Sequence, residues 1–442
     1  MSTSAVQHDA ELSPNPDASR EWSRLQRIAF RFCFIYFTLY CLTNQIILGL
    51  FSFIVIEIPD PATHWPIKQL VTWVAAHVFR VTRPLVYFSG SGDKTFDWVL
   101  AFCLLLVSAI GLAIWSARDN RKNYASLHKW FRLFIRFALA GQMFGYGLAK
   151  VVPLQMPFPT LLRLIEPYGN FSPMGVLWYS VGASPAYEIF AGCAETLGGI
   201  LLIFPRTTTL GALVCLVDLL QVFALNMTYD VPVKLFAFHL ILMALLVLAP
   251  DARRLANFLL LDRAVPRAAE PALFASPRRN RIAVIAQVAF GIVLLGMNIF
   301  GSWKGWYQYG GGAPKSPLYG IWNVAQFSMN GEVRAPLLTD NDRWRRIVFE
   351  FPTMVACEHM DGTVERLGAK VNVDQKALSL TRFDDKNWKA EFTFQRPAPN
   401  RLILDGEMDH KKMHLETELV DRQKFLLVNR GFHWVQETPF NR

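Results

Sequence analysis

The chain has 442 residues, of which 52% are hydrophobic and 13% aromatic, and it carries a formal net charge of +10. This apolar content excludes an ordinary soluble protein and indicates one that lies largely in lipid. The positive charge comes mostly from arginine and lysine beside apolar segments, so we expect membrane lipids as partners and no nucleic acid. The six cysteines form no CxxC pair, which leaves no support for a dithiol motif or a zinc knuckle.

Seven apolar segments are long enough to cross the roughly 30 Å of hydrocarbon in a bilayer. They lie near residues 28–56, 97–116, 131–151, 186–204, 209–227, 233–249 and 282–300. Arginine and lysine are concentrated before the first, third, fifth and seventh segments, which predicts a cytoplasmic N-terminus and a chain that lies outside after Ser302. The first 22 residues lack the apolar region of a cleaved leader. We expect an integral protein of a bacterial inner membrane.

The predicted organisation follows from these spans. It consists of a cytoplasmic polar tail at 1–26, two transmembrane helices with a long outer loop at 27–128, a four-helix membrane core at 129–250, a basic cytoplasmic loop at 251–281, a seventh transmembrane helix with an aromatic belt at 282–309, and an extracytoplasmic β domain at 310–442. In the outer loop, Trp65–Val81 has the spacing of an interfacial helix. The loop tip Ser89–Lys94 is interpreted as a flexible turn or, alternatively, an anion-binding nest.

Ionisable residues inside the core mark the candidate site, because a charge in hydrocarbon is costly unless it faces a partner or a wet cavity. We assign proton-carrying, catalytic roles to Glu195, Asp218 and His239, and expect Asp218, Gln221 and His239 to face each other across neighbouring spans. The expected substrate-binding residues are Gln142, Tyr146, Lys150, Glu188, Gln221, Asn226, Tyr229, Asp230 and Lys234. No metal site is expected.

Structural interpretations of the same residues stay open. Lys150 lies near the end of its span and could reach the water boundary along its own stem. Glu195 could be a structural residue paired with a donor, and a histidine on an apolar face is commonly just hydrogen-bonded. Between these spans, the proline-rich segment 152–184 predicts an outer loop with a short re-entrant helix near Met174–Val181.

The tail after Tyr319 has the pattern of an antiparallel β meander closing into a sandwich or small barrel. Strands are predicted at 320–329, 345–351, 364–371, 378–381, 388–395, 401–404, 413–419 and 425–428. The opening Gly320-Ile321-Trp322 resembles the Gly-x-Trp start of lipocalin-like barrels. Cys357–Met360 could supply metal ligands, but adjacent strand residues point to opposite faces, so a solvated strand is expected there.

Several segments of the core are similar to one membrane family. They are Arg136 with Gly145–Lys150, Tyr187–Gly199, Arg206–Ala212 and Tyr229–Lys234. Together they resemble the DoxX-like family over residues 130–250, about a quarter of the chain. The resemblance implies a four-helix membrane core and a link to quinone-dependent oxidoreductases, since the family includes membrane subunits of a thiosulfate–quinone oxidoreductase.

Two functions are compatible with the sequence, and whether the protein is an enzyme stays open. In the first, a membrane subunit of a quinone-linked oxidoreductase system binds a quinone-like or other amphipathic molecule in a polar pocket. Without a flavin, haem or dithiol motif, its electrons come from a redox partner protein or from the substrate itself. In the second, the helices are a non-enzymatic anchor or assembly factor that presents a lipid- or protein-binding β domain, and the buried charges satisfy one another.

Overall fold

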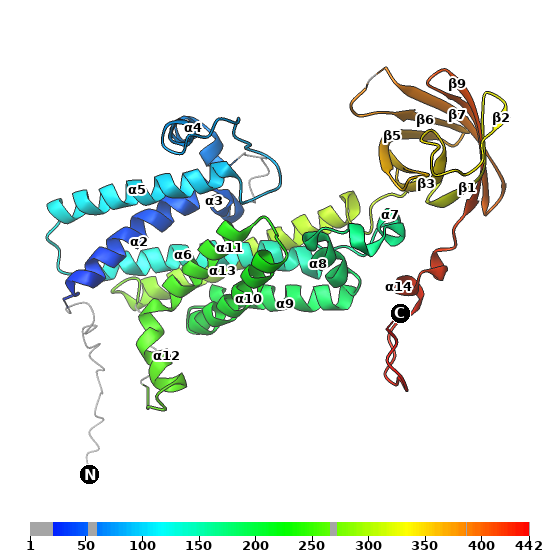
Figure 1. The fold of residues 1–442 in the computed structure, drawn as a ribbon. Coiled ribbons are helices and arrows are strands. Elements are labelled where there is room, and N and C mark those ends of the chain that lie inside the picture. The colour runs from blue at the N-terminus through cyan, green and yellow to red at the C-terminus, as the bar shows by residue number, and fades with distance from the viewer. Residues whose placement is uncertain (1–20, 52–59, 266–271, 386, 442) are drawn as a thin grey trace, which may run out of the picture. The chain divides into compact units, whose positions relative to one another are not determined.

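The computed structural model describes residues 21–51, 60–265, 272–385 and 387–441, and it separates into two compact units (Figure 1). The helical unit contains the chain up to Val152 together with Ile189–Trp303. The β unit contains Pro153–Glu188 together with Lys304–Arg442. The expectation of membrane-length apolar helices and a C-terminal antiparallel β domain is confirmed. Most of the predicted tail at 1–26 lies outside the described residues.

The helical unit is built from long helices and three short ones. Its helices are α2 (Arg24–Thr43), α3 (Gln45–Leu50), α4 (Ile67–His77), α5 (Thr95–Arg118), α6 (Ala125–Val151), α9 (Pro185–Ile203), α10 (Thr208–Thr228), α11 (Lys234–Leu248), α12 (Ala252–Leu259) and α13 (Pro277–Gln308). Six segments among the described residues are long and apolar enough to cross a membrane: Arg24–Thr43, Thr95–Arg118, Pro185–Ile203, Pro205–Thr228, Lys234–Leu259 and Pro277–Gln308.

The third predicted span, 131–151, is the exception among the seven. It forms the 27-residue helix α6, which is too polar to be counted with the six. Its polar side chains Arg136, Gln142 and Lys150 are each 7% exposed, because α6 packs against α2, α3 and α11. A central helix surrounded by other helices does not need the apolar surface that lipid demands. The count of seven apolar spans is therefore wrong by one, although a helix is present.

The first predicted span, 28–56, is not one continuous helix. Helix α2 ends at Thr43, and the side chain of Asn44 accepts the Ile46 amide at 3.1 Å, which caps the separate helix α3. Residues 52–56 of the predicted span lie outside the described residues. The break turns Gln45 toward α6, where its side-chain amide donates to the Tyr146 hydroxyl at 3.1 Å.

The outer loop contains helix α4 within the predicted Trp65–Val81. The loop tip is neither a free turn nor an anion nest. The Asp93 carboxylate accepts the amides of Lys234 and Leu235, each at 2.8 Å, and Gly92 donates to the Pro232 carbonyl at 2.7 Å. A carboxylate of the chain therefore already occupies the N-terminus of α11, where an external anion would bind.

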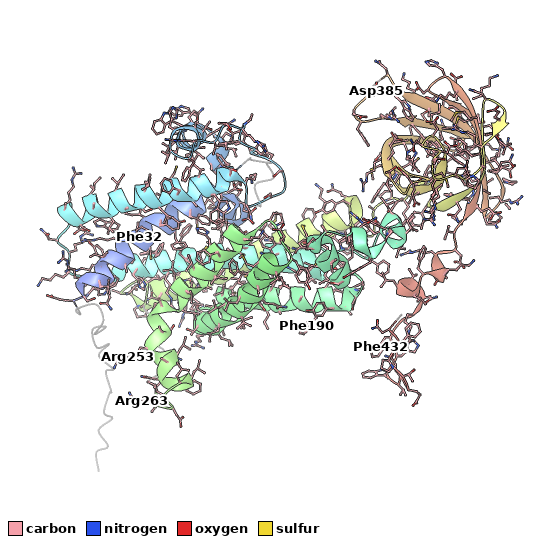
Figure 2. The ribbon with its side chains drawn as sticks, in the orientation of Figure 1. Phe32, Phe190, Arg253, Arg263, Asp385 and Phe432 are labelled. Carbon is pink, nitrogen blue, oxygen red and sulfur yellow. The ribbon has the colours of Figure 1, made fainter. Side chains whose placement is uncertain are left out.

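Large apolar side chains cover the outer surfaces of the long helices. Phe190 projects from α9 and is 69% exposed (Figure 2), and Val217 on α10 is 66% exposed. Such a surface is costly in water but suits acyl chains.

The β unit contains a closed antiparallel barrel of eight strands. Its strands are β1 (Gly320–Met329), β3 (Trp344–Phe351), β4 (Met354–His359), β5 (Val364–Asn372), β6 (Ala377–Thr381), β7 (Lys389–Ala398), β8 (Arg401–Met408) and β9 (Lys411–Leu419), with the short β2 (Glu332–Val333) paired to β1. Pairing of β1 with β9 closes the sheet. The sequence predicted either a sandwich or a small barrel, and the structure shows a barrel.

Two local predictions in the tail are wrong. Residues 425–428 were expected as a strand, but α14 (Leu426–Asn429) is a helix that begins after the closed sheet is complete. Cys357–Met360 was expected as a solvated strand, but Cys357 has no exposed surface and Glu358 is 8% exposed. Cys357 points into the barrel, because β4 lies between β3 and β5. Glu358 points to the other face, where Arg345 and Arg346 pair with it at 3.5 and 3.0 Å.

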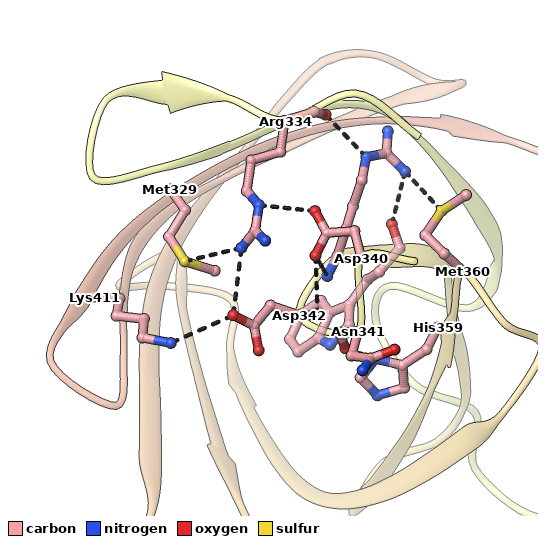
Figure 3. Close-up of polar contacts among 10 residues, drawn as sticks. Met329, Arg334, Asp340, Asn341, Asp342, His359, Met360 and Lys411 are labelled. Atoms are coloured by element: carbon pink, nitrogen blue, oxygen red, sulfur yellow. Dashed lines mark hydrogen bonds and ion pairs between the residues drawn. The ribbon is translucent and has the colours of Figure 1, made fainter. Parts of the chain in front are cut away.

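The barrel interior is occupied by large side chains. An eight-stranded barrel is about wide enough for its own side chains, and the buried aromatics include Trp322, Phe327, Trp344 and Phe349. At one end, the buried guanidinium of Arg343 donates to backbone carbonyls while Arg334 pairs with Asp340 at 2.7 Å (Figure 3). At that end of the barrel, both guanidinium groups therefore have partners within the β unit.

The proline-rich segment 153–188 packs with the barrel. It forms α7 (Leu161–Ile165) and α8 (Pro173–Gly182), the latter at the predicted Met174–Val181. Leu161 belongs to one buried apolar cluster with Ile321 and Val348, and its amide donates to the Glu350 carboxylate at 3.1 Å. The extracytoplasmic domain predicted at 310–442 therefore corresponds to only part of the compact β unit.

Candidate functional site

A buried ion pair joins two helices of the helical unit. Lys150 Nζ of α6 lies 2.8 Å from Glu195 Oε2 of α9, and both side chains are 8% exposed. The alternative that Lys150 reaches the water boundary is therefore wrong. An unpaired charge is costly in a water-poor interior, so the two side chains compensate each other there.

Glycines bring α6 and α9 close enough for this pair to form. A Cβ built on Gly147 would lie 2.5 Å from Thr196 Oγ1, and one built on Gly192 would lie 2.5 Å from the Gly147 carbonyl oxygen. Gly198 plays the same role toward α10, since its Cβ would lie 2.8 Å from Cys215 Sγ. Small residues at such interfaces allow backbones to touch, as in other membrane helix pairs.

Asp218 of α10 is the third charged group at this place. Its carboxylate interacts electrostatically with both Glu195 and Lys150. Its Oδ2 atom is buried and has no hydrogen-bond partner among the described residues. Tyr146 of α6 interacts electrostatically with Glu195 as well. We call Tyr146, Lys150, Glu195 and Asp218 the buried charge cluster.

The charges of the cluster do not balance. Two carboxylates face one ammonium, which leaves one negative charge if both are ionised. A low-dielectric interior disfavours that excess, and because Asp218 is only partly buried, water, a proton or a hydrogen-bond donor beside it would offset the charge. The cluster can therefore hold and exchange a proton, or accept a donor group from a bound molecule.

His239 lies elsewhere and does not face Asp218 or Gln221, which corrects the prediction. Its Nε2 is 2.7 Å from the Tyr36 hydroxyl of α2, its Nδ1 is 2.7 Å from the Leu235 carbonyl, and its ring stacks on Tyr40 at 3.9 Å. Because a carbonyl only accepts, Nδ1 carries the proton and Nε2 accepts from Tyr36. Both nitrogens are satisfied, so His239 clamps α11 to α2 and has no free position for proton transfer.

Four other residues that were predicted to bind substrate are not part of the buried charge cluster. Gln221 is exposed on the outer side of α10, and Gln142 is buried against Gly49, whose built Cβ would approach Gln142 Nε2 to 3.0 Å. Asn226 is 4% exposed, and its side-chain nitrogen has no hydrogen-bond partner. Glu188 belongs to the β unit, where its Oε1 accepts the Met156 amide at 2.9 Å.

The predicted residues of the α10–α11 turn form a separate surface group. Lys234 Nζ lies 2.9 Å from Asp230 and 3.8 Å from Asp93, and the Asp230 side chain is 84% exposed. Tyr229 precedes this pair and is only partly buried. These residues tie the turn to the outer loop and are not brought to the cluster.

A second polar group on α6 was not predicted as part of a site. Arg136, 7% exposed, donates to Thr208 Oγ1 at 3.2 Å and to the Gln287 side chain. One turn earlier, Arg132 pairs with Asp251 at 3.0 Å. The signal was visible as two arginines four residues apart in an apolar span, a spacing that places them on one helix face.

A comparison with curated proteins shows the family to which the chain belongs. The chain is 34% identical over 129 residues to a Bacillus subtilis (strain 168) protein, "Uncharacterized protein YwoB", and the match covers 29% of this chain and 79% of YwoB. No family model and no solved structure matches the chain. The chain belongs to the protein family that includes YwoB of Bacillus subtilis.

Proposed function

We propose that the helical unit is a DoxX-like membrane subunit of a quinone-linked oxidoreductase system and binds a quinone-like, amphipathic molecule at the buried charge cluster. The observation that supports this most is the buried Asp218 Oδ2, which has no hydrogen-bond partner in the described part of the chain although it lies beside an ion pair. Native interiors rarely leave such an atom unsatisfied, and a ligand donor is one way to complete it.

The chemistry of a quinone suits these groups. A quinone carbonyl accepts a hydrogen bond, which the Lys150 ammonium or the Tyr146 hydroxyl can donate. Reduction to the quinol consumes protons as well as electrons, and the resulting hydroxyl can donate to Asp218. Asp218 and Glu195 are the groups that hold or pass protons, while electrons arrive from a redox partner protein.

The test is to identify what the protein retains on purification. Full-length protein in mild detergent is extracted with organic solvent, and the extract is analysed by mass spectrometry. We expect a quinone with the unmodified protein and with Gln221→Leu, a change at an exposed position one turn from Asp218. We expect none with Asp218→Asn. Recovery of phospholipid alone from all three samples would contradict the proposal.

We also propose the location and orientation of the chain, namely a bacterial inner membrane with the N-terminus and the basic loop 251–281 in the cytoplasm and the β unit outside. The alternation of basic loops along the chain supports this orientation. Protease added to intact spheroplasts should cleave the β unit, whereas cleavage in the loop 251–281 should require broken membranes.

A second candidate is a non-enzymatic anchor that presents the β unit to a lipid or protein. It is favoured by an open hollow of about 410 Å³ on the barrel, lined by Lys376, Phe394 and Arg396 among others. Because side chains fill the barrel interior, such a ligand would bind to the outer surface of the barrel. Under this function, Lys376→Glu would weaken ligand capture, and Asp218→Asn would leave it unchanged.

A further inference from the structure

Helix α12 is amphipathic although it is only two turns long. At about 100° per residue, Arg253, Arg254 and Asn257 share one side of the helix, and the apolar residues occupy the other. A helix with this division of residues covers its apolar side with the core of its own protein, with another protein or with lipid.

The apolar side of α12 is mostly uncovered by the described residues. Leu255 packs against the helical core, but Phe258 is 65% exposed and Leu259 is 62% exposed. The chain continues with Leu260 and Leu261, which are 80% and 53% exposed. Four consecutive large apolar side chains therefore extend beyond the packed bundle.

The position of α12 indicates what covers it. It follows α11 after one tight turn, and the segment Lys234–Leu259 contains an apolar stretch long enough to cross a membrane. Figure 1 shows α12 leaving the bundle and running across the direction of the long helices, as a helix in the plane of a membrane surface does. A bilayer that contains α11 would thus reach its surface where α12 begins.

The charges around α12 are complementary to anionic head groups. Arg253 and Arg263 project from this region and are exposed (Figure 2). Arg254 is held by Asp251 at 3.3 Å, and Asp251 also pairs with Arg132 of α6, so the base of α12 is fixed to the bundle. Exposed arginines beside an apolar strip are the pattern that binds phospholipid with negative head groups.

We infer that α12 and Leu260–Leu261 form a lipid anchor at the membrane surface. Phe258, Leu259 and Leu260 insert among acyl chains, and Arg253 and Arg263 bind the head groups of anionic phospholipid. The anchor fixes the end of α11 at the boundary of the leaflet. It is independent of the buried charge cluster, and no ligand in the helical unit is needed for it.

The insertion is tested with spin labels on the full-length protein. Single changes Phe258→Cys and Arg253→Cys are labelled after reconstitution in phosphatidylcholine vesicles containing phosphatidylglycerol, and the unmodified protein provides the background of its native cysteines. We expect the label at 258 to be accessible to oxygen and shielded from a water-soluble nickel complex, with the reverse at 253. Equal exposure of both labels to the nickel complex would overturn the inference.

Two further measurements test whether the molecule that covers α12 is anionic phospholipid. Arg253→Gln and Arg263→Gln should each lower the affinity for phosphatidylglycerol about fivefold, measured by native mass spectrometry, because each arginine near an anionic surface adds about that factor. Unchanged affinity in both variants would contradict the head-group contact. Shielding at 258 that appears only at high protein density would show a second copy on this face and would contradict the lipid anchor.

Discussion

The Lys150–Glu195 pair is held together by the cost of separating it. Each side chain is almost wholly buried, and a single charge in such a place loses its hydration without compensation. The pair is therefore a structural necessity before it is a functional group. Asp218 Oδ2 has no such partner among the described residues.

We expect strong energetic coupling between Lys150 and Glu195. Glu195→Gln and Lys150→Met should each destabilise the protein by about 3–5 kcal/mol, because each leaves one buried charge unpaired. The double variant should lose far less stability than the sum of the losses in the two single variants. Unfolding in mixed detergent micelles measures the three values, and additive losses would show that the pair is not formed.

A second residue prediction concerns His239. Tyr36→Phe removes the donor to Nε2 and should destabilise the protein by about 1 kcal/mol or more, since a buried acceptor is left unpaired. Tyr40→Phe retains the ring that stacks on His239 and serves as the control. Quinone binding should be the same in both variants. A loss of quinone binding with Tyr36→Phe but not with Tyr40→Phe would show that His239 is part of the quinone site.

The residues of the cluster could be predicted individually, but the neighbours of each helix could not. Lys150, Glu195 and Asp218 are conspicuous because charges at these depths are rare. His239 is conspicuous for the same reason, yet its partner Tyr36 lies 203 residues earlier in the chain. Short connections predicted that α10 and α11 are neighbours, but they could not determine which face of α11 meets α2.

At the scale of elements, close contact of α6 and α9 determines whether the cluster exists. Gly192→Ala would place a methyl carbon within 2.6 Å of two backbone atoms, which only a shift of a whole helix can relieve. We expect a loss of about 1–3 kcal/mol in stability and a weakened Lys150–Glu195 pair.

Gly145→Ala is the matched control for this change. It lies on α6, and its Cβ would meet Asn298 Oδ1 at an ordinary 3.7 Å. Thermal unfolding of both variants in detergent provides the comparison. Equal stability of the two would mean that the helices are not in close contact at Gly192.

The β unit should respond to pH through Glu350, which caps α7. Burial raises the pKa of the Glu350 carboxyl above its ordinary 4.5, and the Leu161 amide offsets part of that rise. The folded state thus binds this proton more tightly than the unfolded state. The contribution to stability is complete below pH 4.5 and is lost as pH rises through the folded pKa.

Glu350→Gln keeps an acceptor for Leu161 but cannot titrate. The difference in unfolding temperature between the unmodified protein and this variant should therefore change with pH above 4.5 and be constant below it. Tryptophan fluorescence of full-length protein during heating measures the difference. A constant difference across the whole range would contradict the assignment.

Element prediction succeeded where the periodicity was undisturbed and failed at two kinds of place. The strands β5 and β9 alternate along their length and were predicted nearly to their ends. A strand was expected at Cys357–Met360, which overlaps β4, but its burial was missed because the consecutive residues Val355–Glu358 are all buried and give no alternation. The span containing α2 was predicted too long because Asn44 can cap a helix as well as occupy its interior.

The whole molecule consists of two units, and the chain passes from one to the other three times, after Val152, Glu188 and Trp303. The segment 153–188 is part of the β unit, although it connects α6 to α9, the helices that carry Lys150 and Glu195. Its assignment depends on contacts such as Leu161 with Val348. Those contacts join residues far apart in the sequence, so hydropathy and turn signals could not predict them.

The central claim is that the buried charge cluster binds a quinone-like molecule through Asp218. The most direct measurement is the affinity of a soluble quinone analogue for full-length protein in lipid nanodiscs, compared between the unmodified protein, Asp218→Asn and Gln221→Leu. The account predicts that Asp218→Asn weakens binding at least about tenfold, as expected for a lost buried hydrogen bond to a charged group, and that Gln221→Leu has no effect. Equal affinity in all three proteins would contradict it.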